Sequence, residues 1–128
     1  MSTSFELVVR KTVHDDGDYV LFSISDEKGR PVAYLPLRMK EGVHGAPLRS
    51  GILVDSSVRR RGYASRLIKA AEEHIVATVE DPKRRRIFAV VHPDNIAIRE
   101  LNKKMGYSEM ILYEKKLRPK RRPKGSVK

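Results

Sequence analysis

One stretch decides the fold predicted for this chain, and it reads Ile52-Leu53-Val54-Asp55-Ser56-Ser57-Val58-Arg59-Arg60-Arg61-Gly62-Tyr63-Ala64-Ser65-Arg66-Leu67. Its apolar start is typical of a strand, its arginine- and glycine-rich middle of a loop, and its end of a helix. The first backbone N–H groups of such a helix have no partner within it, and the helix dipole adds partial positive charge. Gly62 lets a ligand approach the backbone, and the arginines can add charge-assisted hydrogen bonds. The junction therefore predicts a site for a phosphate-bearing ligand.

The spacing within this loop disfavours two common phosphate-binding classes. It contains neither the Gly-x-x-x-x-Gly-Lys-Ser/Thr pattern of nucleoside-triphosphate loops nor the Gly-x-Gly-x-x-Gly pattern of dinucleotide-binding folds. The structural alternative is a basic helix start that binds nothing.

The rest of the chain changes its period halfway along. Four apolar segments bounded by turn residues predict strands at residues 5–12, 19–25, 32–39 and 48–55. Apolar residues at spacings of three and four then predict a helix over 62–79, and a second helix begins at Asp94 or Asn95 as N-cap and ends at Gly106. Strands are predicted at 87–92 and 110–117. The order is β-β-β-β-α-β-α-β, which belongs to the α/β (α+β) class.

Length and charge predict one domain with a basic extension. A chain of 128 residues has room for one core. Eight basic residues and no acidic residue lie within 115–128, so residues 1–114 carry only +3 of the net charge of +11. We therefore expect a domain over 1–117 and a disordered tail over 118–128, which either attracts nucleic acid or another polyanion or only aids solubility. No cysteine, export signal or membrane-length apolar run is present, so we expect a cytoplasmic, soluble protein.

Two motifs in the second half resemble one family. Val54, Arg59, Gly62 and Ala64 match the signature Val-x-x-x-x-Arg-x-x-Gly-x-Gly/Ala of the GNAT superfamily of acyl-CoA N-acyltransferases. The segment from His92 to Tyr107 resembles that family's second motif, in which a strand ends in Asn, a helix follows, and the run closes with Lys-Leu/Met-Gly-Phe/Tyr. The resemblance covers about residues 48–117.

The resemblance implies a fold, a donor and a set of binding residues. It implies a mixed, mostly antiparallel sheet with two main helices, in which the fourth and fifth strands splay apart and the pantetheine arm of acetyl-CoA enters the gap. Val54 would pair with that arm through its backbone, and Asn95 would contact it. An amine would attack the thioester directly, and it must be neutral to do so. The pyrophosphate would be held by the backbone amides of Arg59, Arg60, Arg61, Gly62, Tyr63, Ala64 and Ser65.

The catalytic residues depart from the family pattern. Members often carry a tyrosine seven residues after the Asn, which protonates the departing thiolate, and Asn102 stands there. An amide cannot act as an acid, although it can donate a hydrogen bond to sulfur. Residues 48–54 contain no carboxylate to act as base, so His92 is the candidate base, because imidazole titrates near neutrality. The alternative, which we favour, is that His92 only helps to start the second helix. The other histidines show no ligand-like spacing, so no metal is predicted.

A second departure concerns the acceptor. The family usually inserts helices after the first strand, whereas this chain has only a turn over 13–18, so a small acceptor would be poorly enclosed. We therefore expect an amine on a protein, while a homodimer partner that completes the pocket stays open. The competing hypothesis is a GNAT-like module with weak or no turnover, which binds nucleic acid, the ribosome or a polymerase through basic surfaces.

Overall fold

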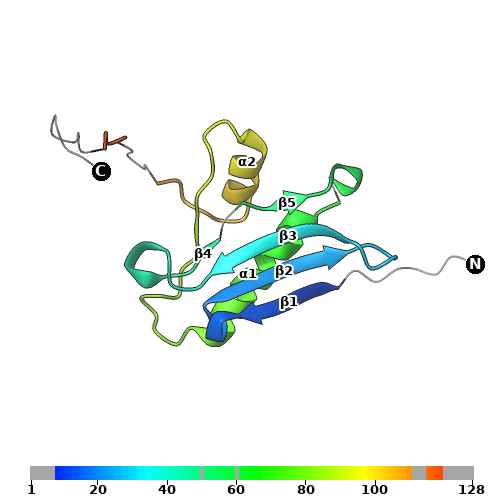
Figure 1. The fold of residues 1–128 in the computed structure, drawn as a ribbon, viewed down its shortest axis with the longest axis horizontal. Helices are drawn as coiled ribbons and strands as arrows, with labels where there is room; N and C mark the ends of the chain where they lie inside the picture. Colours follow the sequence, from blue (N-terminus) through cyan, green and yellow to red (C-terminus); the bar gives the residue numbers. More distant parts are fainter. Residues whose placement is uncertain (1–7, 50, 60, 111–114, 120–128) are drawn as a thin grey trace, which may run out of the picture.

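The computed structural model describes residues 8–49, 51–59, 61–110 and 115–119. Helix α1 crosses one face of the sheet, and α2 lies near β4 and β5 (Figure 1). In chain order, the described elements are β1 (Val9–His14), β2 (Tyr19–Ser25), β3 (Pro31–Arg38), β4 (Leu48–Arg49), β5 (Leu53–Val54), α1 (Tyr63–Thr78), β6 (Phe88–Ala89) and α2 (Ile96–Lys104).

The first three strands form an antiparallel meander. β1 pairs with β2 from Val9–Ile24 to His14–Tyr19, and β2 pairs with β3 along its whole length. A 3-10 turn, Asp15–Gly17, joins β1 to β2, and its three residues all have positive φ. Asp and Gly tolerate that conformation better than most residues do. The predicted hairpin is thereby confirmed, with a connection as short as the sequence indicated.

The fourth predicted strand is divided into two pieces, β4 and β5. Both pair antiparallel with β3, with Arg49 opposite Leu37 and Leu53 opposite Tyr34. Four steps along this strand therefore correspond to three steps along β3, so the register shifts by one residue between the two pieces. β6 runs parallel to β4 alone, and their last pair is Arg49 with Ala89. Beyond that pair β5 has β3 as its only strand neighbour among the described residues.

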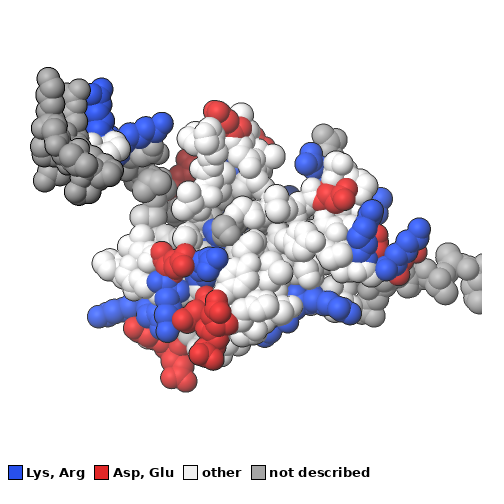
Figure 2. Space-filling view, in the orientation of Figure 1, with Lys and Arg blue, Asp and Glu red and all other residues white. Residues whose placement is uncertain are grey.

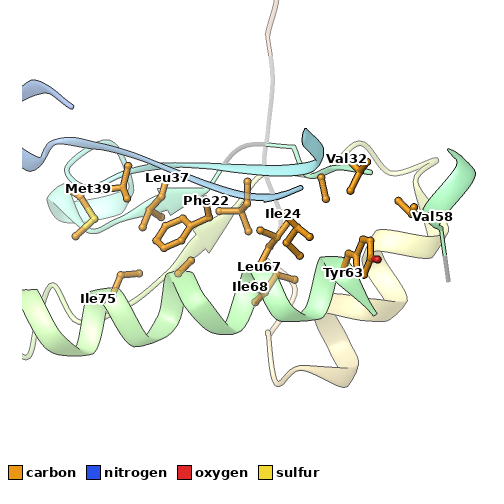
Figure 3. Packing of buried hydrophobic residues seen from close by; sticks show 14 of the residues in the cluster. Phe22, Ile24, Val32, Leu37, Met39, Val58, Tyr63, Leu67, Ile68 and Ile75 are labelled. Atoms are coloured by element: carbon orange, nitrogen blue, oxygen red, sulfur yellow. The ribbon is translucent and has the colours of Figure 1, made fainter. Parts of the chain in front are cut away.

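The core lies between α1 and the meander, as Figure 3 shows. The α1 residues predicted to form one apolar face include Leu67, Ile68, Ala71 and Ile75, and all four are buried. They meet the inward side chains of β2 and β3, which alternate with exposed or half-buried ones as strand geometry requires. The buried core residues of β2 and β3 are Val20, Phe22, Ile24, Val32, Ala33, Leu35 and Leu37.

The predicted elements agree with the structure with some shifted ends. Both helices are confirmed, and the mixed, mostly antiparallel sheet is as expected. The first strand runs to His14 rather than Thr12, and the strand expected over 87–92 is only two residues long. The last strand, expected over 110–117, falls largely on residues 111–114, which lie outside the described residues, and its described ends are not in a strand. Within the described part of the chain, no helix has the length and apolar character needed to cross a bilayer.

One titratable group that packs against the core makes the folding stability depend on pH. His74 of α1 is half-buried, its ring meets the Phe22 ring edge-on at 5.9 Å, and Lys11 Nζ lies 3.4 Å from its Nδ1. Burial lowers the pKa of His74, and the Lys11 charge lowers it further. The unfolded chain therefore binds a proton at higher pH than the folded protein, so folding stability falls as pH drops through and below the ordinary histidine value of 6.5.

We expect the melting temperature of the protein to fall between about pH 7 and pH 5. His74→Gln should flatten that slope, because the group that charges is gone. His14→Gln, a change at an exposed histidine of β1, is the control and should leave the slope as it is. Scanning calorimetry across this range checks both variants, and equal slopes in wild type and His74→Gln would contradict the assignment.

Candidate active site

The loop that follows β5 is held at both ends by its own residues. The Asp55 carboxylate accepts hydrogen bonds from the backbone N–H and the hydroxyl of Ser57, both at 2.9 Å. The backbone bond, followed by the hydroxyl bond, keeps the pKa of Asp55 below its ordinary value. Val58 is buried in the core and anchors the 3-10 turn Ser56–Val58. The chain therefore reaches the start of α1 along a defined path.

The start of α1 has the open geometry that the sequence predicts. Gly62 has φ 76° and ψ 16°, the left-handed conformation, and no side chain of the described residues caps the helix there. The Ser65 hydroxyl donates to the Gly62 carbonyl at 3.1 Å, so it does not cap a backbone N–H group of the helix. Arg59 and Arg61 are exposed. Uncapped amides beside exposed guanidinium groups form a ready site for a phosphate group.

The side chains of the other loop residues divide between core and surface. Tyr63 is buried, so only its backbone can face a ligand, whereas Ala64 and Ser65 are half-buried. Arg60 lies outside the described residues.

The backbone of Val54 faces away from the sheet. The Asp55 N–H donates to the Val32 carbonyl of β3 at 2.8 Å. Because backbone groups of successive strand residues point to opposite sides, the N–H and C=O of Val54 point away from β3. Its carbonyl accepts a 3.4 Å hydrogen bond from Arg59 Nε. An extended ligand can therefore add to this edge as a strand would.

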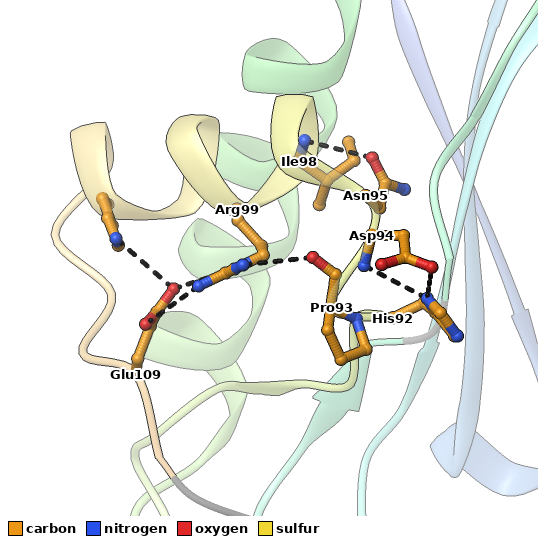
Figure 4. A network of polar contacts seen from close by, with 8 residues as sticks. His92, Pro93, Asp94, Asn95, Ile98, Arg99 and Glu109 are labelled. Carbon is orange, nitrogen blue, oxygen red and sulfur yellow. Dashed lines mark hydrogen bonds and ion pairs between the residues drawn. The ribbon is translucent and has the colours of Figure 1, made fainter.

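The segment before α2 is a network of local contacts, drawn in Figure 4. The Asn95 side chain accepts from the Ile98 N–H at 3.3 Å, which confirms Asn95 as the N-cap and leaves its NH₂ group available to a ligand. His92 Nδ1 accepts from the Asp94 N–H at 3.2 Å. These are contacts of a residue that starts a helix, so the catalytic role of His92 stays a prediction.

Arg99, near the start of α2, ties the helix to the chain on both sides of it. Arg99 donates to the Pro93 carbonyl and to Glu109, both at 3.1 Å. The bond from Arg99, more than the nearby Lys103 charge, keeps the pKa of Glu109 below its ordinary value.

Arg49 is a functional candidate that the sequence did not single out. It is the last residue of β4 and is 1% exposed. Its Nη2 donates to Oδ1 of Asn102 on α2, and its guanidinium carbon lies 5.1 Å from the centre of the Tyr107 ring. Its Nε has no hydrogen-bond partner, and no ion pair among the described residues includes it. A buried charge without a counter-charge costs on the order of several kcal/mol, so stability alone does not explain it.

Tyr107 is the third residue of the cluster with Arg49 and Asn102, and it does not neutralise the Arg49 charge. Burial raises the pKa of Tyr107 against the smaller opposing effect of Arg49, which lies over the ring and does not bond the hydroxyl. The sequence held one signal for Arg49, because it is the one charged residue within 48–54 of a predicted strand. Among the described residues, no three His, Asp or Glu side chains gather as metal ligands would.

The sequence profile of the acetyltransferase (GNAT) family matches residues 2–107. The chain therefore belongs to this family, and the earlier resemblance is confirmed. No curated protein sequence matches the chain significantly.

Solved structures agree on the fold. Aminoglycoside N-acetyltransferase AAC(6′)-Iy in complex with CoA superposes with a TM-score of 0.63 and 19% identity, over 78% of this chain and 68% of that one. The same enzyme with a bisubstrate analogue gives a TM-score of 0.66 and 17% identity, over 88% of this chain and 100% of that one. A GCN5-related N-acetyltransferase from Ralstonia eutropha JMP134 gives 0.61 and 25% identity, over 80% and 67%.

Proposed function

We propose that the protein is an N-acetyltransferase that uses acetyl-CoA as donor and an amine as acceptor. The observation that carries this is the uncapped start of α1, which follows directly on the unpaired edge of β5. The amides from Arg59 to Ser65 bind the pyrophosphate, the Val54 backbone pairs with the pantetheine arm, and the free NH₂ group of Asn95 contacts that arm. AAC(6′)-Iy, which shares this fold and was crystallised with CoA in two crystal forms, supports the choice of carrier.

The chemistry needs little from acid–base groups. A neutral amine attacks the thioester carbonyl, and a tetrahedral intermediate with a negatively charged oxygen forms. A backbone N–H near Val54 that points away from β3 stabilises this oxygen, because a fixed dipole needs no rearrangement as the charge develops. Neither His92 nor Asn102 is required as an acid in this sequence of steps.

We propose an amine on a protein as the acceptor. The connection between β1 and β2 is the single turn Asp15–Gly17, so no helix from that connection walls off a pocket for a small molecule. A partner subunit that supplies the wall is the alternative, and AAC(6′)-Iy, by its name, acts on small aminoglycosides. Acetylation of protein lysines and of an aminoglycoside, measured side by side, separates the two acceptor classes.

The donor is tested by thermal shift. Acetyl-CoA at a hundred times its dissociation constant should raise the melting temperature by about 10 °C, because it binds only the folded protein. CoA release, measured with a thiol reagent in the presence of an amine, then tests transfer. An unchanged melting temperature at millimolar acetyl-CoA would refute the proposed function.

One observation favours a second candidate, a binding module without turnover. Asn102 replaces a proton donor, and its amide oxygen is engaged by Arg49. Under this candidate function, acetyl-CoA binds but no acetyl group is transferred, and the basic tail over 118–128 contacts a polyanion. On the face in Figure 2, however, Lys and Arg side chains lie among Asp and Glu side chains and form no continuous basic surface.

A further inference from the structure

A buried cation lies where two strands of the sheet part. Arg49 and Ala89 are the last pair that joins β4 to β6. Beyond them β5 stays with β3, and the chain after β6 leads to α2. The Arg49 side chain donates a hydrogen bond to Asn102, so it connects the last paired residue of β4 to helix α2. If a ligand pairs along β5 with its phosphates at the start of α1, its other end runs back along the strand toward β4 and Arg49.

The groups at this point are arranged to receive negative charge. A guanidinium only donates hydrogen bonds, so the amide oxygen of Asn102 must face Arg49, and the NH₂ group of Asn102 must point elsewhere. The Nε of Arg49 is an unused donor in a buried position. A permanent cation, a free N–H and an oriented amide together form a binding site for an anion.

We propose that Arg49, held by Asn102, stabilises the thiolate of coenzyme A as it leaves the acetyl group, which assigns a new role to Arg49 and rests on the function proposed above. The amine nitrogen forms a bond to the carbonyl carbon, the carbon–sulfur bond breaks, and its electron pair stays on sulfur. The amine's proton passes to solvent. Sulfur is the atom of the carrier that becomes negative at this end of the opening, and the guanidinium stabilises it as a thiolate without donating a proton.

A shift in the titration of bound coenzyme A follows. A neighbouring positive charge lowers the pKa of an acid by about one to three units. The thiol of bound coenzyme A should therefore ionise at lower pH than the free thiol, and its affinity should rise with pH between those two values, by about ten- to thousand-fold. Desulfo-coenzyme A, which lacks the sulfur, should bind independently of pH across this range.

Two other titratable groups bear on the site. Burial raises the pKa of Tyr107, so its hydroxyl stays neutral in this range. The negative charge of Glu72 on α1 raises the pKa of Tyr107 further, and the same charge would oppose the effect of Arg49 on a nearby thiol. Glu72→Gln should therefore leave the shift intact or enlarge it.

The test titrates the thiol of coenzyme A bound to the full-length protein by the ultraviolet absorbance of the thiolate. The complex with desulfo-coenzyme A supplies the baseline and removes tyrosine absorbance. Wild type is compared with Arg49→Met, Arg49→Lys and Asn102→Ala, and Arg38→Met is the control, since Arg38 is an exposed arginine at the end of β3. We expect a lowered thiol pKa in wild type and Arg38→Met, a reduced shift in Arg49→Lys and Asn102→Ala, and none in Arg49→Met.

Each other outcome has a definite meaning. If the bound thiol of wild type titrates like the free thiol, the thiolate site is refuted. The same result is expected if Arg49 instead binds a carboxylate of the acceptor. An equal shift in wild type and Arg49→Met would assign the effect to another group. Should Arg49→Met not fold, an unreduced shift in Arg49→Lys refutes the proposal. If wild type binds desulfo-coenzyme A and coenzyme A equally, only the inference fails, and if it binds neither, the proposed function fails with it.

Discussion

A Gly62→Val variant is expected to fold and to lose about a hundredfold or more of its affinity for acetyl-CoA. Gly62 has φ +76°, a conformation that costs a β-branched residue about 1–2 kcal/mol or more. A Cβ atom there would meet only Ser65 Oγ at 3.8 Å, an ordinary contact, so the fold has room for it. The methyl groups would cover the backbone amides that we propose bind the phosphates. Two lost hydrogen bonds to a charged group amount to about 3–6 kcal/mol.

Gly29→Val is the matched control for this variant. Gly29 also has positive φ, +79°, with nothing within 4 Å of a built Cβ, and it lies in the turn between β2 and β3. It should lower stability by a similar amount and leave the affinity for acetyl-CoA unchanged. Titration calorimetry on both variants decides, and wild-type affinity in Gly62→Val would mean that the phosphates bind elsewhere.

Leu67→Ala is expected to lower the free energy of unfolding by about 2–5 kcal/mol. Leu67 has no exposed surface and lies on the α1 face that meets the sheet, where the truncated side chain would leave a cavity. Val76→Ala in the same helix is the control, because Val76 is 67% exposed and its change should stay within about 0.5 kcal/mol. Urea denaturation measures both, and similar losses for the two variants would mean that α1 packs through a different face.

Most of the fold could be predicted from the sequence because the sequence patterns of helices and strands are local. The spacing of Leu67, Ile68, Ala71 and Ile75 predicts both α1 and its buried face, and each is buried in the structure. Gly62 marked the start of α1 for the same reason, since positive φ at that junction favours glycine. Strand ends were less certain, because the length of a strand depends on the partner it pairs with. β6 shows this, since only Phe88 and Ala89 find partners in β4.

The candidate site divides in the same way. The loop from Arg59 to Ser65 is contiguous, so its chemistry can be read from neighbouring residues along the chain. The burial of Arg49 cannot be read in this way, because it depends on packing against residues far along the chain, such as Asn102, which is 53 positions away. An arginine in a strand is exposed unless the tertiary structure covers it. The sequence alone thus determined both helices, most of the strands and the family, and it predicts where phosphates bind, whereas the tertiary structure decided that Arg49 is buried beside Asn102, because burial is a property of packed neighbours.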